Sequence, residues 1–336
     1  MTDLLRTIED IRRRTVPDRR LGVYDITLLD DAAGHRLAGV TTSRDALSAL
    51  RRLAADAKLP LDVRVLPDVE VASAAAVVTA AVAPLQSTPA VRAERSSEVL
   101  HGEAVTVLEL RDAWLRVRAA DGYHGWIHEG YVRTGSAEWA EDWVGRSGGR
   151  SLGVEVRLAD GRVRLPLGAR LALRRDGRVE TADGRNGDVV SGAVRPDSET
   201  GAEARLVAPS EWAQRWFGAA PYLWGGRTEW GTDCSGLTQT VYAFRGTALP
   251  RDTDLQMAAG ADVPITKDGR GYEAGDLLFF AEQGRVSHVA LWAGAGHIVH
   301  SALSRGGVGT DDLQGDAPYV RKLRENLVAV RRVSPR

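Results

Sequence analysis

The spacing of apolar positions predicts a small α/β unit at the start of the chain, over residues 1–72. A helix is predicted over 4–13 and a second over 43–57, where leucines recur on one face. The runs LGVYDITLLD and LDVRVLP have the composition of strands, and the turn DAAGH introduces a further strand between them. This unit holds no constellation of residues that predicts catalysis.

The middle of the chain consists of short alternating runs, which predict two small β-barrels. The first, over residues 75–134, contains EAVTVLELR, WLRVRAA and HGWIHEGYV with turns between them. The second, over 137–205, is more divergent, and hairpin signals such as Asp183-Gly184 separate its runs. The polar, acidic segment 196–204 is predicted to link this region to the last domain.

Residues 206–336 are predicted to combine helices with strands. Leu237, Val241 and Phe244 have the spacing of one helix face. Further on, the runs SHVALWAG and HIVHSA are typical of strands, and the glycines between them indicate a tight turn. The fold class expected from the pattern is therefore multidomain, with an α/β unit, two barrels and an α+β domain.

Composition narrows the functions that the protein can have. The 44 basic and 45 acidic residues give a net charge of −1, which offers no electrostatic case for nucleic-acid binding. A single cysteine rules out an internal disulfide. The first twenty residues lack the apolar core of a signal peptide, and no run reaches the ~18 apolar residues of a membrane helix. We therefore expect a cytoplasmic protein without nucleic-acid or membrane partners.

The only cysteine, Cys234, has the surroundings of a nucleophile. Asp233 can cap the helix that follows, so that Cys234 lies in its first turn. Unpaired N–H groups and the helix dipole favour a thiolate there, and a partner imidazolium could bring the pKa of the thiol below neutral. The alternative is a small buried structural cysteine.

Two histidines downstream support the nucleophile interpretation. His288 lies in the first of the two predicted strands and His300 in the second, and the midpoint between them is residue 294. A hairpin turning there places them opposite one another, with Cβ atoms about 5 Å apart. His288 would then be the base and His300 would hold its tautomer, whereas His297 should face away.

A zinc site is a rival explanation, because one cysteine and two histidines can bind zinc. The chain contains no HExxH motif and no second cysteine, so no metal is expected. No cofactor is expected either.

The segments PYLWGG, DCSGL, LPRDTDLQ, AGDLLFF, SHVALW and HIVHS, in this order, resemble the NlpC-type cysteine peptidases, which cleave the stem peptides of bacterial peptidoglycan. The resemblance covers about residues 206–336 and implies a papain-like domain with an antiparallel sheet. PYLWGG fits the subgroup that hydrolyses the γ-D-glutamyl–diaminopimelate bond. The first barrel is similar to the bacterial Src-homology-3-like domain that often precedes such a peptidase.

The resemblance implies a set of substrate-binding residues. The groove would be lined by Tyr222, Trp224, Asp233 and Ser235, and the amino end of the peptide would be contacted by Asp252 and Thr253. From the first barrel, Glu98 and Tyr123 are the candidates for binding the substrate's amine. Arg251 could form an ion pair with its neighbour Asp252.

The expected partner is a murein peptide, L-Ala-γ-D-Glu-diaminopimelate with a free amine, and the protein is expected to be a monomer. Two features lead to the expectation of a free amine. The barrel could close one end of the groove, and Asp252 would lie at that end, where a buried carboxylate needs a positively charged partner. Three alternatives stay open at this point. They are a secreted endopeptidase that acts on intact peptidoglycan, a cell-wall-binding protein without catalysis, and an acyltransferase or simple amidase on the same fold.

Overall fold

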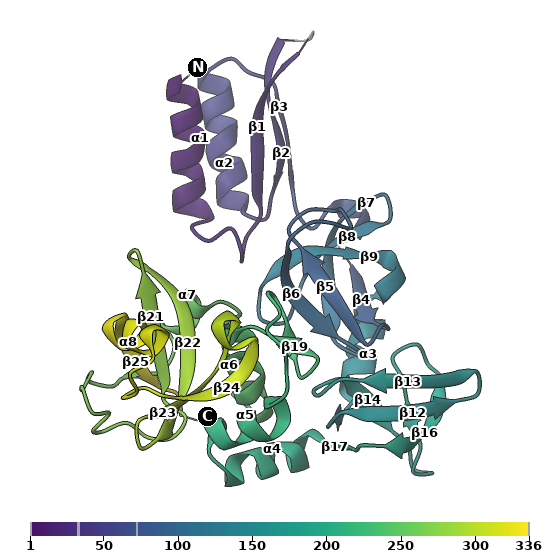
Figure 1. Ribbon diagram of the computed structural model, residues 1–336. Coiled ribbons are helices and arrows are strands. Elements are labelled where there is room, and N and C mark those ends of the chain that lie inside the picture. Colours follow the sequence, from purple (N-terminus) through teal and green to yellow (C-terminus); the bar gives the residue numbers. More distant parts are fainter. Residues whose placement is uncertain (1, 32–33, 72, 335–336) are drawn as a thin grey trace.

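The computed structural model describes residues 2–31, 34–71 and 73–334, which form an N-terminal unit above a larger body (Figure 1). In the N-terminal unit, the helices α1 (Thr2–Thr15) and α2 (Arg44–Asp56) lie side by side on one face of a sheet (Figure 1). The sheet has the order β1 (Tyr24–Asp31), β2 (Gly34–Thr41), β3 (Leu61–Val65), with β1 antiparallel and β3 parallel to β2. The expected two helices and three strands are confirmed.

The first barrel is a bent sheet of seven strands, preceded by a short turn of helix, η1 (Val69–Val71). Its strands are β4 (Ala74–Val78), β5 (Val82–Gln86), β6 (Arg95–Leu100), β7 (Ala104–Arg111), β8 (Trp114–Arg118), β9 (His124–His128) and β10 (Val132–Ser136), with η2 (Glu129–Tyr131) before the last. Apolar side chains of alternate positions fill its interior. The strand β6, with the sequence RSSEVL, is one that the apolar pattern did not predict.

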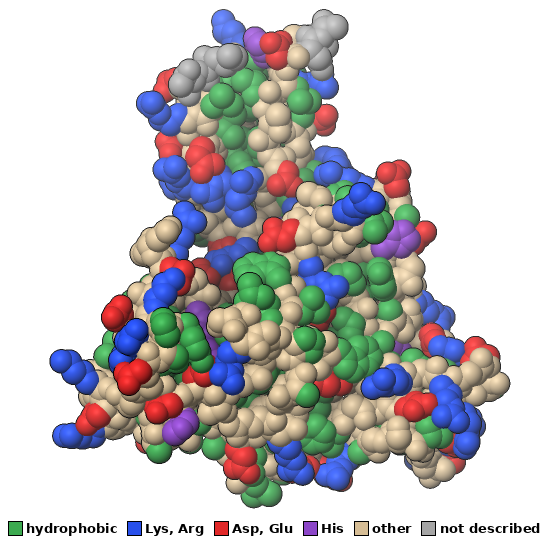
Figure 2. All heavy atoms as spheres, viewed as in Figure 1, with side chains coloured by type: hydrophobic (Ala, Val, Ile, Leu, Met, Phe, Trp, Pro, Cys, Tyr) green, Lys and Arg blue, Asp and Glu red, His purple; other side chains and the backbone are tan. Residues whose placement is uncertain are grey.

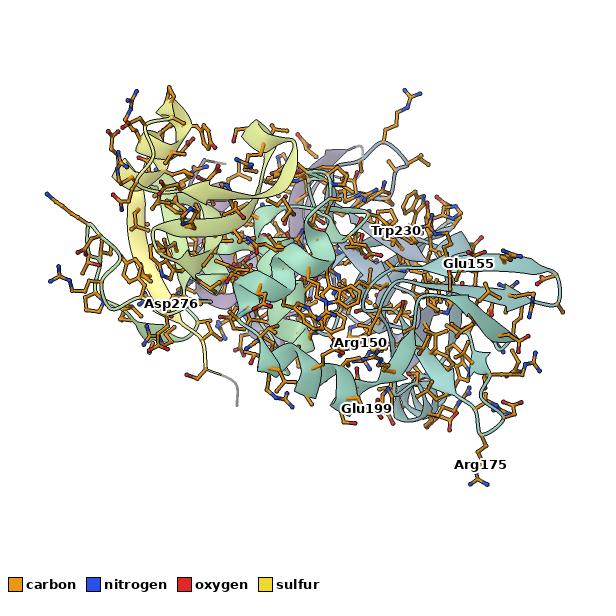
Figure 3. All side chains as sticks on the ribbon, turned by 60° about the horizontal axis from the view of Figure 1, so that its bottom comes forward. Arg150, Glu155, Arg175, Glu199, Trp230 and Asp276 are labelled. Carbon is orange, nitrogen blue, oxygen red and sulfur yellow. The ribbon has the colours of Figure 1, made fainter. Side chains whose placement is uncertain are left out.

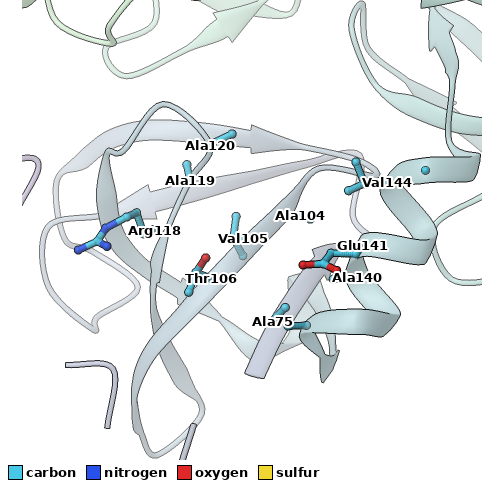
Figure 4. A pocket seen from close by; sticks show the side chains of 12 residues that line it. Ala75, Ala104, Val105, Thr106, Arg118, Ala119, Ala120, Ala140, Glu141 and Val144 are labelled. Atoms are coloured by element: carbon cyan, nitrogen blue, oxygen red, sulfur yellow. The ribbon is translucent and has the colours of Figure 1, made fainter. Parts of the chain in front are cut away.

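Helix α3 (Ala137–Arg146) joins the two barrels and is held by Trp143, whose buried indole Nε1 donates to the Gly102 carbonyl at 2.8 Å. Between α3 and the first barrel lies a cavity of about 430 Å³, whose twelve lining residues are mostly small and apolar (Figure 4). None of these lining residues is a cysteine or a histidine. The cavity therefore lies apart from the residues that the sequence marked for catalysis.

The second barrel is also a seven-stranded sheet. It contains β11 (Gly149–Ser151), β12 (Val154–Leu158), β13 (Gly161–Leu165), β14 (Arg170–Leu173), β15 (Val179–Glu180), β16 (Asn186–Ser191) and β17 (Val194–Pro196). Arg150 lies between this barrel and the helices of the last domain, with its guanidinium 4.6 Å from the Phe244 ring centroid (Figure 3). The predicted polar link over 196–204 was wrong in one respect, because most of it forms the helix α4 (Asp197–Leu206).

The C-terminal domain packs helices against a six-stranded antiparallel sheet, as expected. The sheet order is β20 (Ala261–Asp262), β25 (Leu327–Arg332), β21 (Leu277–Glu282), β22 (Arg285–Gly294), β23 (His297–Ala302), β24 (Gly307–Asp312), with η3 (Leu303–Arg305) before β24. The helices are α5 (Pro209–Phe217), α6 (Cys234–Phe244), α7 (Thr253–Gln256) and α8 (Pro318–Glu325), and a small ribbon of β18 (Arg227–Thr228) and β19 (Gly231–Thr232) precedes α6. One apolar core lies between the sheet, α5 and α6, and it takes in Leu152 and Leu167 of the second barrel.

Candidate active site

Cys234 is the first residue of α6, as the sequence predicts. The carboxylate of Asp233 caps the helix by accepting the Gly236 N–H at 2.7 Å. Gly236 is required for a second reason, because a Cβ there would lie 2.1 Å from the Gly226 carbonyl oxygen. Because Gly236 has no side chain, the loop that contains Trp224 and Gly226 can lie against the start of the helix. The thiol is therefore positioned by a cap on one side and a close backbone contact on the other.

His288 and His300 lie on adjacent strands, β22 and β23, but the register differs from the predicted one. Leu291 pairs with Val299, so the turn centres on Ala295 rather than on residue 294. His300 is therefore a diagonal neighbour of His288 and does not lie directly opposite. Diagonal positions share a face of the sheet, and aromatic side chains can reach one another across them. The two rings do so, with Nε2 of His288 2.7 Å from Nδ1 of His300.

The histidine pair continues to a third residue, Asp311 on β24, that the sequence analysis missed. Nε2 of His300 lies 2.8 Å from Oδ2 of Asp311, and both side chains are buried. Hydrogen bonds from Tyr319 and Arg305 hold the other carboxylate oxygen, Oδ1. These partners and His300 keep the pKa of Asp311 below its usual value, although burial opposes them.

This chain of side chains fixes the proton positions on both rings. Because the Asp311 carboxylate can only accept, His300 carries its proton on Nε2, and its Nδ1 accepts from Nε2 of His288. The remaining nitrogen of His288, Nδ1, is then unprotonated. In this tautomer His288 can take a proton from a neighbouring group.

The pKa values describe a neutral resting pair, which differs from the expected thiolate. Burial, with a smaller contribution from Asp233, raises the pKa of Cys234 to about 11, although the Val289 backbone N–H and the hydroxyl of Thr253 oppose the shift. Burial and His300 lower the pKa of His288 to about 3. The helix start does not compensate for the loss of water around the sulfur. The thiol Sγ lies 3.7 Å from Oγ1 of Thr253.

Beneath the nucleophile, Asp233 forms a buried ion pair with Arg251. The guanidinium contacts both carboxylate oxygens, at 3.0 and 2.7 Å, and also donates to Oγ of Ser235 at 2.9 Å. The expected pairing of Arg251 with Asp252 was wrong, because the arginine points into the domain rather than along the chain. Asp233 and Ser235 are themselves buried, so they support the site from below.

Tyr222 and Trp224 lie on the loop before α6, at the surface of the site. Burial, with smaller contributions from Cys234 and Asp233, raises the pKa of the Tyr222 phenol to about 12. The Trp224 ring is 60% exposed, and its Nε1 donates to Glu94 of the first barrel at 3.0 Å. An exposed indole held in place in this way offers a flat apolar surface on the loop before α6.

Asp252, the residue predicted to meet the amino end of the substrate, lies where three units of the chain come together. The phenol of Tyr123, from the first barrel, lies near enough to lower the pKa of Asp252, although burial raises it more. Nη1 of Arg20, from the N-terminal unit, lies 2.9 Å from Oδ2 of Asp252 and also contacts Asp254. Tyr123 and Asp252 are thus brought together as expected, but nothing in the sequence pointed to Arg20.

Glu98 is not part of this group. Its carboxylate is buried, hydrogen-bonded to Arg95 and to the Arg227 backbone N–H, the latter at 3.1 Å. Both oxygens are therefore used at the seam between the first barrel and the loop before α6. That Glu98 binds the substrate's amine stays a prediction, and these contacts would have to rearrange for it.

Across residues 2–31, 34–71 and 73–334, no three His, Cys, Asp or Glu side chains gather in an arrangement that could hold a metal ion. In the same part of the chain, every helix is too short or too polar to span a bilayer.

A cysteine at a helix start, packed against a sheet that carries a histidine pair, defines a papain-like peptidase domain. Residues 218–326 match the NlpC/P60 family, and residues 85–130 match the bacterial dipeptidyl-peptidase Sh3 domain. The chain belongs to the NlpC/P60 family and is a cell-wall peptidase with a Src-homology-3-like domain before the catalytic one. The expected fold class is confirmed.

Two relatives and one solved structure extend over much of the chain. The gamma-D-glutamyl-L-lysine dipeptidyl-peptidase of Bacillus subtilis (strain 168) is 30% identical over 61% of this chain and 71% of its own length. Dipeptidyl-peptidase 6 of Lysinibacillus sphaericus is 28% identical over 74% of this chain and 94% of its own. A crystal structure of an NlpC/P60 family protein from Bacillus cereus ATCC 10987 aligns with a TM-score of 0.60 at 20% identity, over 77% of this chain and 99% of that one, and so shows a shared fold.

Proposed function

We propose that the protein is a cysteine peptidase in which Cys234 is the nucleophile and His288 the general base. Its substrate would be a murein stem peptide with a free N-terminal L-Ala, cleaved between γ-D-Glu and the diamino acid. The observation that carries the proposal is the hydrogen-bonded series His288, His300 and Asp311 beside a cysteine at a helix start.

The reaction begins with a neutral thiol. Sγ attacks the carbonyl carbon of the γ-D-Glu amide as its proton passes to the free Nδ1 of His288. The backbone N–H of Cys234, at the helix start, stabilises the oxyanion. The C–N bond then breaks as His288 returns the proton to the leaving amine. Water, deprotonated by the same imidazole, hydrolyses the thioester and restores the thiol.

The buried surroundings give the imidazolium its stabilisation. A positive charge on His288 would be stabilised by the hydrogen bond to His300, which in turn donates to the ionised Asp311. Arg305 and Tyr319 keep Asp311 ionised by donating to its other oxygen. Charge-assisted hydrogen bonds of this kind are stronger than neutral ones. The hydrogen bonds of His288, His300 and Asp311 therefore stabilise the imidazolium of His288 while it holds the proton of the thiol.

The proposed preference for a free amine depends on the acidic group at the end of the groove. The guanidinium of Arg20 is surrounded by the carboxylates of Asp18, Asp252 and Asp254, which leaves an excess of negative charge. A substrate ammonium would be attracted to it, and the phenol of Tyr123 acts on Asp252 from the first barrel. The names of the two relatives, both dipeptidyl-peptidases, agree with cleavage two residues from a free N-terminus.

A free L-Ala amine exists only after an amidase has removed the glycan, so the proposed substrate is a released peptide and the proposed role is its recycling. The test is to incubate the protein with L-Ala-γ-D-Glu-diaminopimelate and, separately, with intact sacculi, and to identify the products by mass spectrometry. Release of L-Ala-D-Glu from the peptide supports the proposal. Equal release from sacculi would refute the recycling role, and no cleavage of either would refute the peptidase assignment.

A further inference from the structure

Arg20 brings a positive charge from the N-terminal unit to the carboxylate that is proposed to receive the substrate's amine. It lies on the loop between α1 and β1, and the space-filling view shows basic side chains gathered at this end of the unit, close to the body (Figure 2). Its Nη1 is 2.9 Å from Oδ2 of Asp252, a residue 232 positions further along the chain. The place of the substrate's ammonium is thus already next to a cation of the protein itself.

The three carboxylates share the guanidinium unequally. Asp254 accepts two hydrogen bonds from it, at 2.7 and 2.8 Å, and Asp18 accepts from Nε at 2.9 Å and from Nη2 at 2.6 Å. Asp252 has a single bond, to the Nη1 that Asp254 also uses. An incoming ammonium can therefore replace the bond to Asp252 while Arg20 keeps two carboxylate partners.

The pKa directions agree with this ranking. Hydrogen bonds from Arg20 are the main cause that lowers the pKa of Asp18 and of Asp254. Burial instead raises the pKa of Asp252, and Arg20 only partly offsets it.

We propose that Arg20 determines specificity at the amine end of the groove, by pairing with Asp252 when the substrate carries no ammonium there. The inference rests on the proposed function. With Arg20 present, a peptide with a blocked N-terminus leaves Asp252 still paired, so blocking the amine costs less than it would without Arg20. Without Arg20, a free ammonium would be the ion-pair partner of Asp252, whereas a blocked peptide leaves this part-buried carboxylate without one.

The Arg20 side chain is separable from the docking of the loop that carries it. The ring Nε2 of His124 donates to the Arg19 carbonyl at 2.8 Å, and the His124 backbone N–H donates to the Arg20 carbonyl at 3.1 Å. A further ion pair joins Arg116 of the first barrel to Asp25 of β1 at 2.7 Å. These contacts remain when only the guanidinium is removed, and Asp25→Asn supplies a matched control that weakens docking alone.

The experiment compares kcat/KM for L-Ala-γ-D-Glu-diaminopimelate and for its N-acetyl form in the wild type, Arg20→Gln, Asp254→Asn and Asp25→Asn. Arg20→Gln should raise the ratio of free to acetylated by about tenfold, the lower end expected for one charge-assisted hydrogen bond, chiefly through KM. Asp254→Asn should lower the ratio, because Arg20 loses its ion pair with Asp254 and then pairs more strongly with Asp252, so that the free ammonium competes less well. Asp25→Asn should leave the ratio at the wild-type value.

Two outcomes would overturn the inference. One is an unchanged ratio in Arg20→Gln, which includes an equal change for both peptides. The other is the same shift in Asp25→Asn, which would assign the effect to docking. Asp254→Asn tests the same inference with the opposite sign if Arg20→Gln does not fold. Failure of the wild type to cleave either peptide would instead count against the proposed function, so the two failures are distinguishable.

Discussion

Replacing Asp311 with asparagine should lower kcat by about 10- to 100-fold and leave KM nearly unchanged, because the loss of a hydrogen bond to a charged group costs about 1.5–3 kcal/mol. The change keeps the shape of the side chain but removes its charge. The bond from His300 Nε2, 2.8 Å long and almost wholly buried, then loses its anionic acceptor. An amide can also turn its NH₂ towards the ring and reverse the tautomer of His300, which would put a proton on the wrong nitrogen of His288. Arg305, which is 35% exposed, can be solvated in place of the lost partner.

The assay is steady-state kinetics on the free stem peptide, combined with ¹⁵N NMR of the histidine rings. The wild type should show His300 and His288 both protonated on Nε2, whereas Asp311→Asn should show mixed tautomers. The matched control is Asp312→Asn, on the next residue of the same strand, whose exposed carboxylate accepts only from the Gln314 N–H at 2.9 Å among the described contacts. If kcat falls less than about twofold and the tautomers are unchanged, Asp311 has a structural role only.

Further predictions concern the nucleophile and its support. Cys234→Ala should abolish hydrolysis and His288→Ala should be nearly as damaging; activity that survives Cys234→Ala and falls with a chelator would favour a metal centre. Because burial raises the pKa of Cys234 to about 11, labelling by iodoacetamide, followed by mass spectrometry, should accelerate about tenfold per pH unit between pH 7 and 9. A rate that is already constant below pH 7 would instead show a thiolate–imidazolium pair. Arg251→Met should lower the free energy of unfolding, measured with denaturant, by about 3–5 kcal/mol because it leaves Asp233 buried and unpaired; the exposed Arg270→Met is the control, and equal midpoints would contradict the reasoning.

That the two histidines share a face of the sheet could be predicted, because this depends only on an even number of positions separating them across the hairpin. The sequence placed the turn at residue 294, and the structure places it at Ala295, which shifts the pairing by two residues. A shift by two keeps every side chain on its own face of the sheet, whereas a shift by one would have moved His300 to the other face. The helix cap at Asp233 was equally accessible, since a cap needs only neighbouring residues.

Asp311 was missed although the same reasoning could have found it. In the next hairpin His300 pairs with Gly309, so Asp311 lies two positions along on the same face. The run GVGTDD has few apolar residues and therefore lacks the pattern that predicts a strand. Strand β6 was missed for a related reason, because Ser97 and Glu98 are polar yet buried against another unit. Alternating apolar and polar residues predict a strand whose one face packs on the core of its own domain. The pattern is lost where a neighbouring unit buries polar side chains of the strand.

Arg20 could not have been found from the sequence at all, because nothing local selects its partners. A chain with 44 basic and 45 acidic residues offers many combinations, and only the docking of the N-terminal unit brings Arg20 to Asp252. The nucleophile and its base lie within one domain, where short-range rules apply, whereas the amine end of the groove is assembled from three units. Loss of a contact at that seam should therefore change which peptides are accepted, while the bond-breaking groups remain in place.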